Sequence, residues 1–140
     1  MDLVSLWSQG VDTKCVLCKN SSESRNHLFF ECSFSAQVWA HLVKGILQNL
    51  FTAEWSDIEI LLVDRNRERY QLFCVRYAFQ AAVYALWRER NRRRHGEPPL
   101  PSQALMKLVH KGIRNKLSLM KLQDGKRFDG ILQYWFATRL

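Results

Sequence analysis

The sequence predicts a mainly α-helical fold of three to four helices, with a small cysteine-containing segment before the first helix. From Ser33 onward, apolar residues recur at steps of three and four, which is the spacing of one face of a helix. Residues 13–32 hold three cysteines and one histidine but few large apolar residues, so we expect something other than a hydrophobic core to stabilise them. The chain of 140 residues has the length of one domain. We therefore expect one structural domain made of residues 1–32, a helical region over 33–121 and a C-terminal tail over 122–140.

The first two helices are predicted from their periodicity and from a start signal. The first begins at Ser33 and carries an apolar stripe that includes Val38 and Trp39. A second helix is predicted from Ser56, because Ser56 and Glu59 have the spacing of a capping box. The pattern leaves open whether this helix breaks around residues 64–66.

Two longer helices follow. The segment 67–94 is apolar nearly all round in its middle, which is typical of a central core helix. His95 and Gly96 offer a C-cap, and the prolines just beyond them prevent the helix from continuing. Ser102 can cap a last long helix that extends to about residue 121, and a short apolar segment lies at 131–136.

The charge of the chain is unevenly distributed. The net charge is +8, yet residues 1–60 carry four bases and seven acids, a net −3, whereas residues 61–140 carry 17 bases and six acids, a net +11. A basic half of this kind suggests a polyanionic partner: DNA, RNA or an acidic membrane surface. No apolar stretch approaches the roughly 20 residues of a membrane span, and the N-terminus lacks the pattern of a signal peptide. We therefore expect reduced cysteines and a nuclear or cytoplasmic location.

A metal site is predicted from the spacing C-x2-C-x8-H-x4-C, which is formed by Cys15, Cys18, His27 and Cys32. Three sulfurs and one imidazole suit tetrahedral Zn²⁺, and a site with four protein ligands is structural rather than catalytic. The fold prediction is therefore a small zinc knuckle followed by three to four helices.

Other interpretations of these residues stay open at this point. The cysteines can be reduced structural residues beside a surface histidine, or the CxxC can be a redox motif, although such a motif normally follows a strand. His41 can replace His27 as a ligand, although it falls on the first predicted helix. Cys74 lies inside the long apolar helix and is better interpreted as a small core residue.

These motifs resemble a known family. The segments CVLC and HLFFEC, followed by Val38 and Trp39, resemble the zinc-binding domain at the C-terminal side of plant LINE-type (non-LTR) retrotransposon reverse transcriptases. The segment LWRERN at residues 86–91 resembles a Trp-x-x-Arg-Asn helix that follows in such elements. The resemblance implies a zinc-stabilised module that binds nucleic acid beside a polymerase, with the three cysteines and the histidine as zinc ligands.

The chain also departs from this family. It contains no Asp-Asp pair of a polymerase, no acidic constellation of a nuclease, and only a short extension before the CxxC. The sequence therefore resembles a detached, retrotransposon-derived fragment without catalytic function. No catalytic residue is predicted, because no Gly-rich phosphate loop, HExxH or deaminase signature is present.

The predicted nucleic-acid contacts lie in the basic half. Five arginines fall within seven residues near the end of the long helix, and three further cations lie on the last long helix: Arg88, Arg90, Arg92, Arg93, Arg94, Lys107, Lys111 and Arg114. The guanidinium fork suits phosphate, so we predict sequence-tolerant binding of RNA or DNA. The same arginines can instead stabilise a helix dipole, or they can act as a nuclear import signal, which favours a nuclear location.

Two other functions are compatible with the sequence. The zinc site and the helices can scaffold a protein–protein interaction module or adaptor, which exposed apolar patches would favour. A basic amphipathic helix can also bind a membrane surface or a calmodulin-like partner. In each case we expect a macromolecular partner and no small-molecule substrate.

Overall fold

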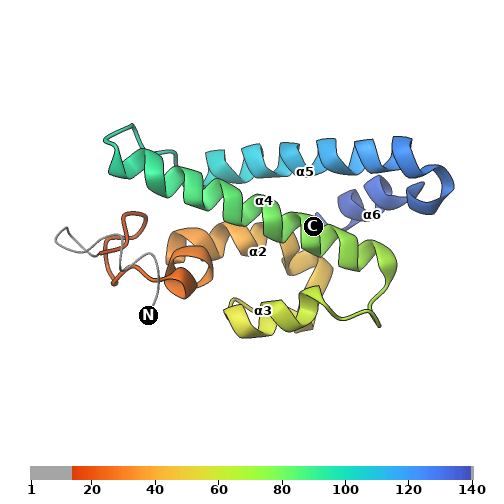
Figure 1. Ribbon diagram of the computed structural model, residues 1–140, viewed down its shortest axis with the longest axis horizontal. Helices are drawn as coiled ribbons and strands as arrows, with labels where there is room; N and C mark the ends of the chain where they lie inside the picture. The colour runs from red at the N-terminus through yellow and green to blue at the C-terminus, as the bar shows by residue number, and fades with distance from the viewer. Residues whose placement is uncertain (1–13, 140) are drawn as a thin grey trace.

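The computed structural model describes residues 14–139, and this part of the chain is mainly helical, as predicted (Figure 1). Within it there are five α-helices, more than the three to four expected. Short helical turns join them, and no named strand occurs in the described residues. In chain order the elements are η1 (His27–Glu31), α2 (Ser33–Leu47), η2 (Gln48–Leu50), α3 (Trp55–Leu62), α4 (Arg69–Arg94), α5 (Ser102–Asp124), η3 (Gly125–Phe128) and α6 (Ile131–Ala137). The apolar lead-in expected over residues 1–12 lies outside the described residues.

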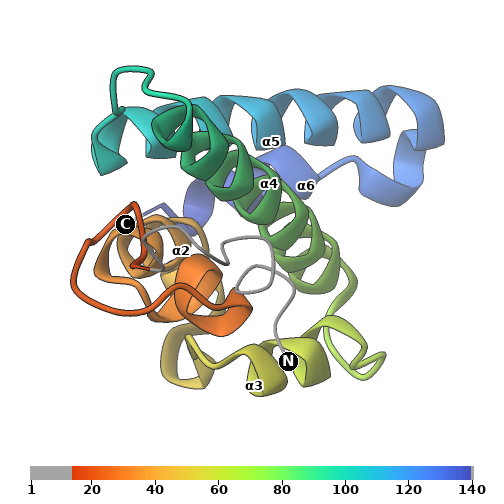
Figure 2. The same cartoon turned by 60° about the vertical axis from the view of Figure 1, so that its left-hand side comes forward.

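Helix α4 is the central element. Figures 1 and 2 show α2 and α3 on one side of it and α5 and α6 on the other, and α2 also packs directly against α5. The buried face of α4 includes Ala78, Ala82 and Leu86, spaced four residues apart on one side of the helix. Small alanine side chains at this face allow neighbouring helices to approach closely. Large buried residues of the facing helices, such as Trp39 of α2 and Leu117 of α5, fill the remaining core.

The start of α3 corrects the capping-box prediction. The helix begins at Trp55 with Glu54 as its N-cap residue, no side chain caps it, and Ser56 lies inside it. The turn before the helix is made by Thr52, whose hydroxyl accepts a hydrogen bond from the Glu54 N–H at 3.1 Å. The Trp55 ring then packs against Phe30, with 5.4 Å between ring centroids. Tertiary packing of Trp55 therefore sets the start of the helix, and the local capping signal does not.

The break that the sequence left open falls between α3 and α4. The carboxylate of Asp64 accepts a hydrogen bond from the Asn66 N–H at 3.0 Å, which turns the chain. Glu68 then caps α4 by accepting a hydrogen bond from the Gln71 N–H at 2.9 Å. At its other end α4 stops at Arg94, followed by Gly96 with a φ of 82°, the left-handed conformation that glycine adopts without strain.

The chain after α5, expected to be a tail, folds onto the core. Phe128, Ile131 and Trp135 are all buried. Helix α6 ends against α2 at Gly45, where an added Cβ would lie 2.0 Å from the Thr138 carbonyl oxygen. Only glycine therefore allows the end of α6 to approach α2 this closely. This contact brings residues 138–139 beside the second half of α2.

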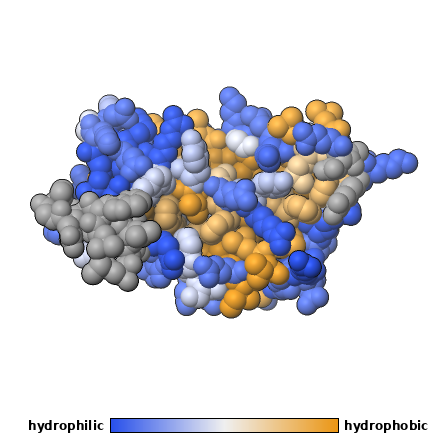
Figure 3. Space-filling view, in the orientation of Figure 1, coloured by the Kyte–Doolittle hydropathy of each residue, from blue (hydrophilic) through white to orange (hydrophobic). Residues whose placement is uncertain are grey.

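Several large apolar side chains remain on the surface, and Figure 3 shows such patches over α3 and towards the C-terminal end of α5. On α5, Leu108 and Leu119 are more than half exposed, and so are Ile60 on α3 and Val63 just after it. Within the described residues, no helix combines the length and the apolar character needed to cross a membrane.

Candidate metal centre and the two basic regions

The first two cysteines of the cluster lie on a tight turn. The Lys19 N–H donates to the Cys15 carbonyl oxygen at 2.7 Å, and Lys19 itself has a φ of 61°. An isolated antiparallel bridge between Lys14 and Ser22 closes this loop. The backbone N–H of Asn20 also points to the Cys18 sulfur at 3.5 Å. The turn therefore places both sulfurs on one side of the loop.

The other two residues of the cluster flank a single π-helical turn. The Cys32 N–H donates to the His27 carbonyl oxygen at 2.7 Å, so residues five apart are brought to the same side of the turn. The Ser24 hydroxyl accepts from the His27 N–H at 3.2 Å and fixes the start of this turn. Leu28, Phe29 and Phe30 are buried between the two ligands. The hydrophobic core thus anchors the segment that carries His27 and Cys32.

The four side chains converge on one point. Their ligand atoms all lie within 4.8 Å of one another, with 3.8 Å between the sulfurs of Cys15 and Cys32 and 3.2 Å from the Cys18 sulfur to His27 Nε2. A tetrahedral Zn²⁺ site with Zn–S bonds of about 2.3 Å has sulfur–sulfur edges of about 3.8 Å. A disulfide would need about 2.05 Å, and the cysteines are free thiols. The residue types and spacing therefore fit a four-coordinate metal site.

The sulfurs also show the electrostatics of a shared-proton pair. The hydrogen bond from Cys15 to Cys32, together with burial, raises the pKa of Cys15. The same hydrogen bond holds the pKa of Cys32 below its usual range, although burial opposes this shift. Proteins bind Zn²⁺ through thiolates, so a bound cation would take the place of the shared proton.

The other candidate metal residues lie elsewhere. Cys74 is fully buried on α4 and takes no part in the cluster, and its burial raises its pKa to about 12. His41 lies on α2 with its ring 6.5 Å from that of His110 on α5. Within the described residues, the four-residue cluster is therefore the one group of this kind whose ligand atoms lie close enough together to hold a metal ion.

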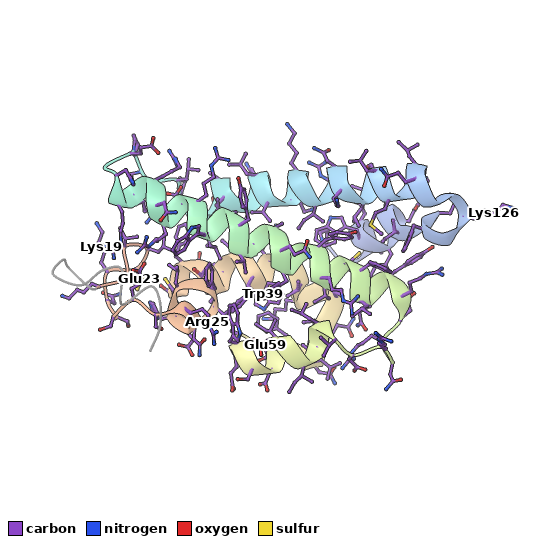
Figure 4. All side chains as sticks on the ribbon, in the orientation of Figure 1. Lys19, Glu23, Arg25, Trp39, Glu59 and Lys126 are labelled. Atoms are coloured by element: carbon purple, nitrogen blue, oxygen red, sulfur yellow. The ribbon has the colours of Figure 1, made fainter. Side chains whose placement is uncertain are left out.

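The arginine cluster at the end of α4 is engaged with two buried glutamates. Arg90 donates from Nε and Nη2 to Glu23 at 2.8 and 3.0 Å, and Arg94 donates from Nη2 to the same carboxylate at 3.0 Å. Glu23 lies in the loop between the two pairs of the metal cluster, on the side of the molecule where α4 ends (Figure 4). Arg90 itself is buried. These ion pairs therefore join the metal-binding segment to α4.

The second glutamate is Glu89. It accepts from Arg92 at 2.7 Å, from Arg93 at 2.8 Å and from the Leu100 N–H at 2.9 Å. Burial by itself would raise the pKa of Glu89, but the hydrogen bonds from Arg93, the Leu100 N–H and Arg92 outweigh it and lower the pKa. Glu89 thus fastens the proline-containing loop before α5 to α4.

The structure separates the predicted nucleic-acid residues into two groups. Of the five arginines, Arg88 is exposed, whereas the other four are paired with Glu23 or Glu89 as described above. Lys107, Lys111 and Arg114 share one face of α5, at positions i, i+4 and i+7, and within the described residues no carboxylate lies within ion-pair distance of them. The Glu89 pairs could have been predicted from their i,i+3 and i,i+4 spacing. Glu23 carries no such signal, because it is 67 residues from Arg90.

Comparison with known families bears on the metal-binding segment. Residues 2–39 match the family model described as zinc-binding in reverse transcriptase. This match confirms, for that part of the chain, the resemblance to a zinc-binding domain associated with reverse transcriptase, and it includes all four residues of the cluster. The zinc-binding family is not the catalytic domain of the enzyme, and its match ends inside α2, so α3 to α6 lie beyond it. Comparisons with curated proteins and with solved structures found no match.

Proposed function

We propose that Cys15, Cys18, His27 and Cys32 hold one structural Zn²⁺. The convergence of their ligand atoms supports this assignment, because four protein ligands complete a tetrahedral shell and leave no position for a substrate. Zinc would tie the loop at residues 14–22 to the start of α2. It would thereby also hold Glu23 against the arginines of α4.

Metal analysis tests the site directly. Purified protein is expected to contain about one zinc per chain, and the variant with serine at both Cys15 and Cys18 is expected to contain almost none. A matched control is Cys74→Ala, which removes a thiol outside the cluster and should leave the zinc content unchanged. Equal zinc in the wild type and in the double-serine variant would contradict the assignment.

We further propose that the chain is a non-catalytic, retrotransposon-derived module that binds RNA or DNA through its basic helical surface. The observation that carries this proposal is the stripe of Lys107, Lys111 and Arg114 on α5, to which no carboxylate of the described residues is paired. Arg88, also exposed, extends the basic surface on α4. The four paired arginines act in this proposal as structural residues, because contact with phosphate would require breaking their buried ion pairs.

A gel-shift titration over a range of salt concentrations tests this function. Three phosphate contacts on duplex DNA should give a log–log salt slope of about −2.7, and on a single strand about −2.1. Lys107→Gln with Lys111→Gln should weaken binding to every sequence by a similar factor. Arg65→Gln with Lys126→Gln removes the same charge from exposed positions elsewhere and serves as the control. Absence of salt-dependent retention of both RNA and DNA would contradict the proposal.

A second candidate function is a protein-interaction module, and one surface feature favours it. A groove of about 490 Å³ lies between α4 and α5, lined by apolar residues that include Ala85, Leu105 and Val109. Tyr84 and Leu108 at this groove are 67% and 58% exposed, so they extend its apolar lining onto the surface, and contiguous apolar surface of this kind can mark a protein interaction site. If a protein binds there, Tyr84→Ala should strongly reduce partner recovery in proximity labelling. The same variant should keep the nucleic-acid affinity of the wild type, because Tyr84 does not line the hollow beside the α5 stripe.

A further inference from the structure

Helix α5 presents its basic stripe to a second wall made by α2 and the end of α6. A hollow of about 660 Å³ is lined by Lys107, Lys111 and Arg114 of α5 and by His41 of α2. An adjoining hollow of about 380 Å³ shares His41. Its lining adds Lys44 of α2 and Arg139 beyond α6. We call the six residues His41, Lys44, Lys107, Lys111, Arg114 and Arg139 the basic cleft.

The basic cleft contains cations to which no carboxylate of the described residues is paired. Neither hollow is lined by an aspartate or a glutamate, and within the described part of the chain no carboxylate lies within ion-pair distance of Lys44, Arg114 or Arg139. The pKa of His110, which lines the larger hollow, is lowered first by burial and then by the charges of Arg114, Arg139 and His41. The contribution of these charges indicates a positive local field. Like charges held together in this way attract an anion from solution.

One donor in the basic cleft also lacks an acceptor. The Nε of Arg114 is buried and has no hydrogen-bond partner among the described residues. A buried N–H without an acceptor is unfavourable, and most such groups in native proteins are satisfied by protein, water or ligand. Arg114 lines the larger hollow, so an anionic oxygen bound there that reached this N–H would satisfy it.

The end of α6 is held in position for such a role. Arg139 donates to the His41 carbonyl oxygen at 3.2 Å and to the Thr138 hydroxyl at 2.9 Å, and its guanidinium lies 3.7 Å above the Trp135 ring. The Trp135 N–H in turn donates to His110 Nε2 at 3.1 Å. These contacts fix Arg139 at the edge of the cleft before any ligand arrives, which lowers the entropy cost of binding.

We propose that the basic cleft binds the phosphodiester backbone of a nucleic-acid strand, with Lys44 and Arg139 contacting it from the wall opposite α5. This assignment rests on the proposed nucleic-acid function and adds the second wall of its site. The stripe on α5 extends about 10 Å along the helix axis, at 1.5 Å per residue, so it matches a run of phosphates better than a single one. A hollow walled on two sides fits a strand better than a flat bilayer surface.

Lys44→Gln combined with Arg114→Gln tests the cleft from both walls. The probes are a fluorescent 20-nucleotide oligo(U), a single-stranded DNA of equal length, and vesicles of phosphatidylserine and phosphatidylcholine. The variant loses two phosphate contacts and the counterion release that goes with them, which predicts about 25-fold weaker binding of the single strands in roughly 0.1 M salt. The slope of log K against log salt should become smaller in magnitude by about 1.4. Arg65→Gln with Lys126→Gln loses the same charge away from the cleft (Lys126 is labelled in Figure 4) and should bind as the wild type does.

Each outcome of this experiment decides the assignment. If the wild type binds nucleic acid and the cleft variant binds equally well, the cleft is not the site, although the proposed function stands. If the wild type binds no nucleic acid, the proposed function fails and the cleft assignment with it. Cleft-dependent binding to vesicles but not to oligonucleotides would overturn the assignment in favour of a membrane surface. Should the Arg114 variant fail to fold, Lys44→Gln with Lys111→Gln alters only exposed side chains and gives the same comparison.

Discussion

Replacing Glu23 by glutamine is expected to be among the most destabilising single changes in this protein. The side chain of Glu23 is only 1% exposed, and it accepts two hydrogen bonds from Arg90, whose side chain is 9% exposed. The substitution leaves the guanidinium of Arg90 buried without its counter-charge. Breaking a buried ion pair on one side costs about 3–5 kcal/mol, because the remaining charge stays desolvated.

Urea unfolding followed by tryptophan fluorescence measures this effect. With a slope of about 2 kcal/mol per molar urea, the loss lowers the unfolding midpoint by roughly 1.5–2.5 M. Glu97→Gln is a matched control, because Glu97 also pairs with an arginine of the cluster, Arg92, but its side chain is 54% exposed. An exposed pair contributes at most about 1 kcal/mol, so the midpoint of the control should move little.

A double variant separates the ion pair from other effects of the substitution. Glu23→Gln with Arg90→Met removes both charges of the most buried pair and is expected to recover part of the lost stability, since the remaining partner of Glu23, Arg94, has a side chain that is 21% exposed and stays partly hydrated. The reasoning is refuted if Glu23→Gln shifts the midpoint no more than Glu97→Gln does. It is also refuted if the double variant is less stable than Glu23→Gln alone.

Three further predictions concern other parts of the fold. Gly45→Ala forces a methyl group against the Thr138 carbonyl oxygen and should lower the free energy of unfolding by about 1–3 kcal/mol. A thermal melt should show this as a Tm lower by roughly 3–10 °C, and an unchanged Tm would contradict the close approach of Thr138 to α2. The pKa of Glu89 is lower in the folded protein than in the unfolded chain, where it is about 4.3. The stability that ionised Glu89 adds to the fold is therefore fully present above that unfolded pKa, and it is lost as the pH falls through the folded pKa. The difference in free energy of unfolding between wild type and Glu89→Gln should therefore narrow between pH 6 and pH 3.5, and a constant difference would contradict this. Burial raises the pKa of Cys74 to about 12, so iodoacetamide should modify this thiol only after unfolding, as mass spectrometry of native and urea-treated protein would show.

The parts of the fold that sequence analysis predicted well are those with local signals. The helix starting at Ser33 agrees with the apolar periodicity, and α4 ends at Arg94 where the glycine and prolines indicated. The spacing of the cysteines and the histidine predicted the cluster, because a tight turn and a short helical turn each constrain where a pair of side chains can lie. Ser56 shows the limit of such signals, since the core contacts of Trp55 moved the helix start away from it.

The parts that sequence analysis could not predict depend on contacts between distant residues. The apolar segment at 131–136 did not indicate where Trp135 would be buried, because its hydrogen-bond partner His110 comes from α5. By intrinsic propensity Gly45 weakens its helix, yet its lack of a side chain admits the Thr138 backbone. In both cases the deciding neighbour lies far along the sequence.

The same limit applies to inferring a binding surface from charge. Five arginines within seven residues are the strongest cationic signal in the sequence, but Glu23 and Glu89 engage four of them in ion pairs that hold the fold together. The α5 stripe is a weaker signal, because its cations are spread along a helix, yet no carboxylate of the described chain neutralises it. A cation contributes to binding a polyanion in proportion to the counterions that it releases from the polyanion, and an arginine already paired with a buried carboxylate can do this only by giving up that pair. The distribution of the carboxylates therefore determines where a polyanion can bind, and the density of arginines does not.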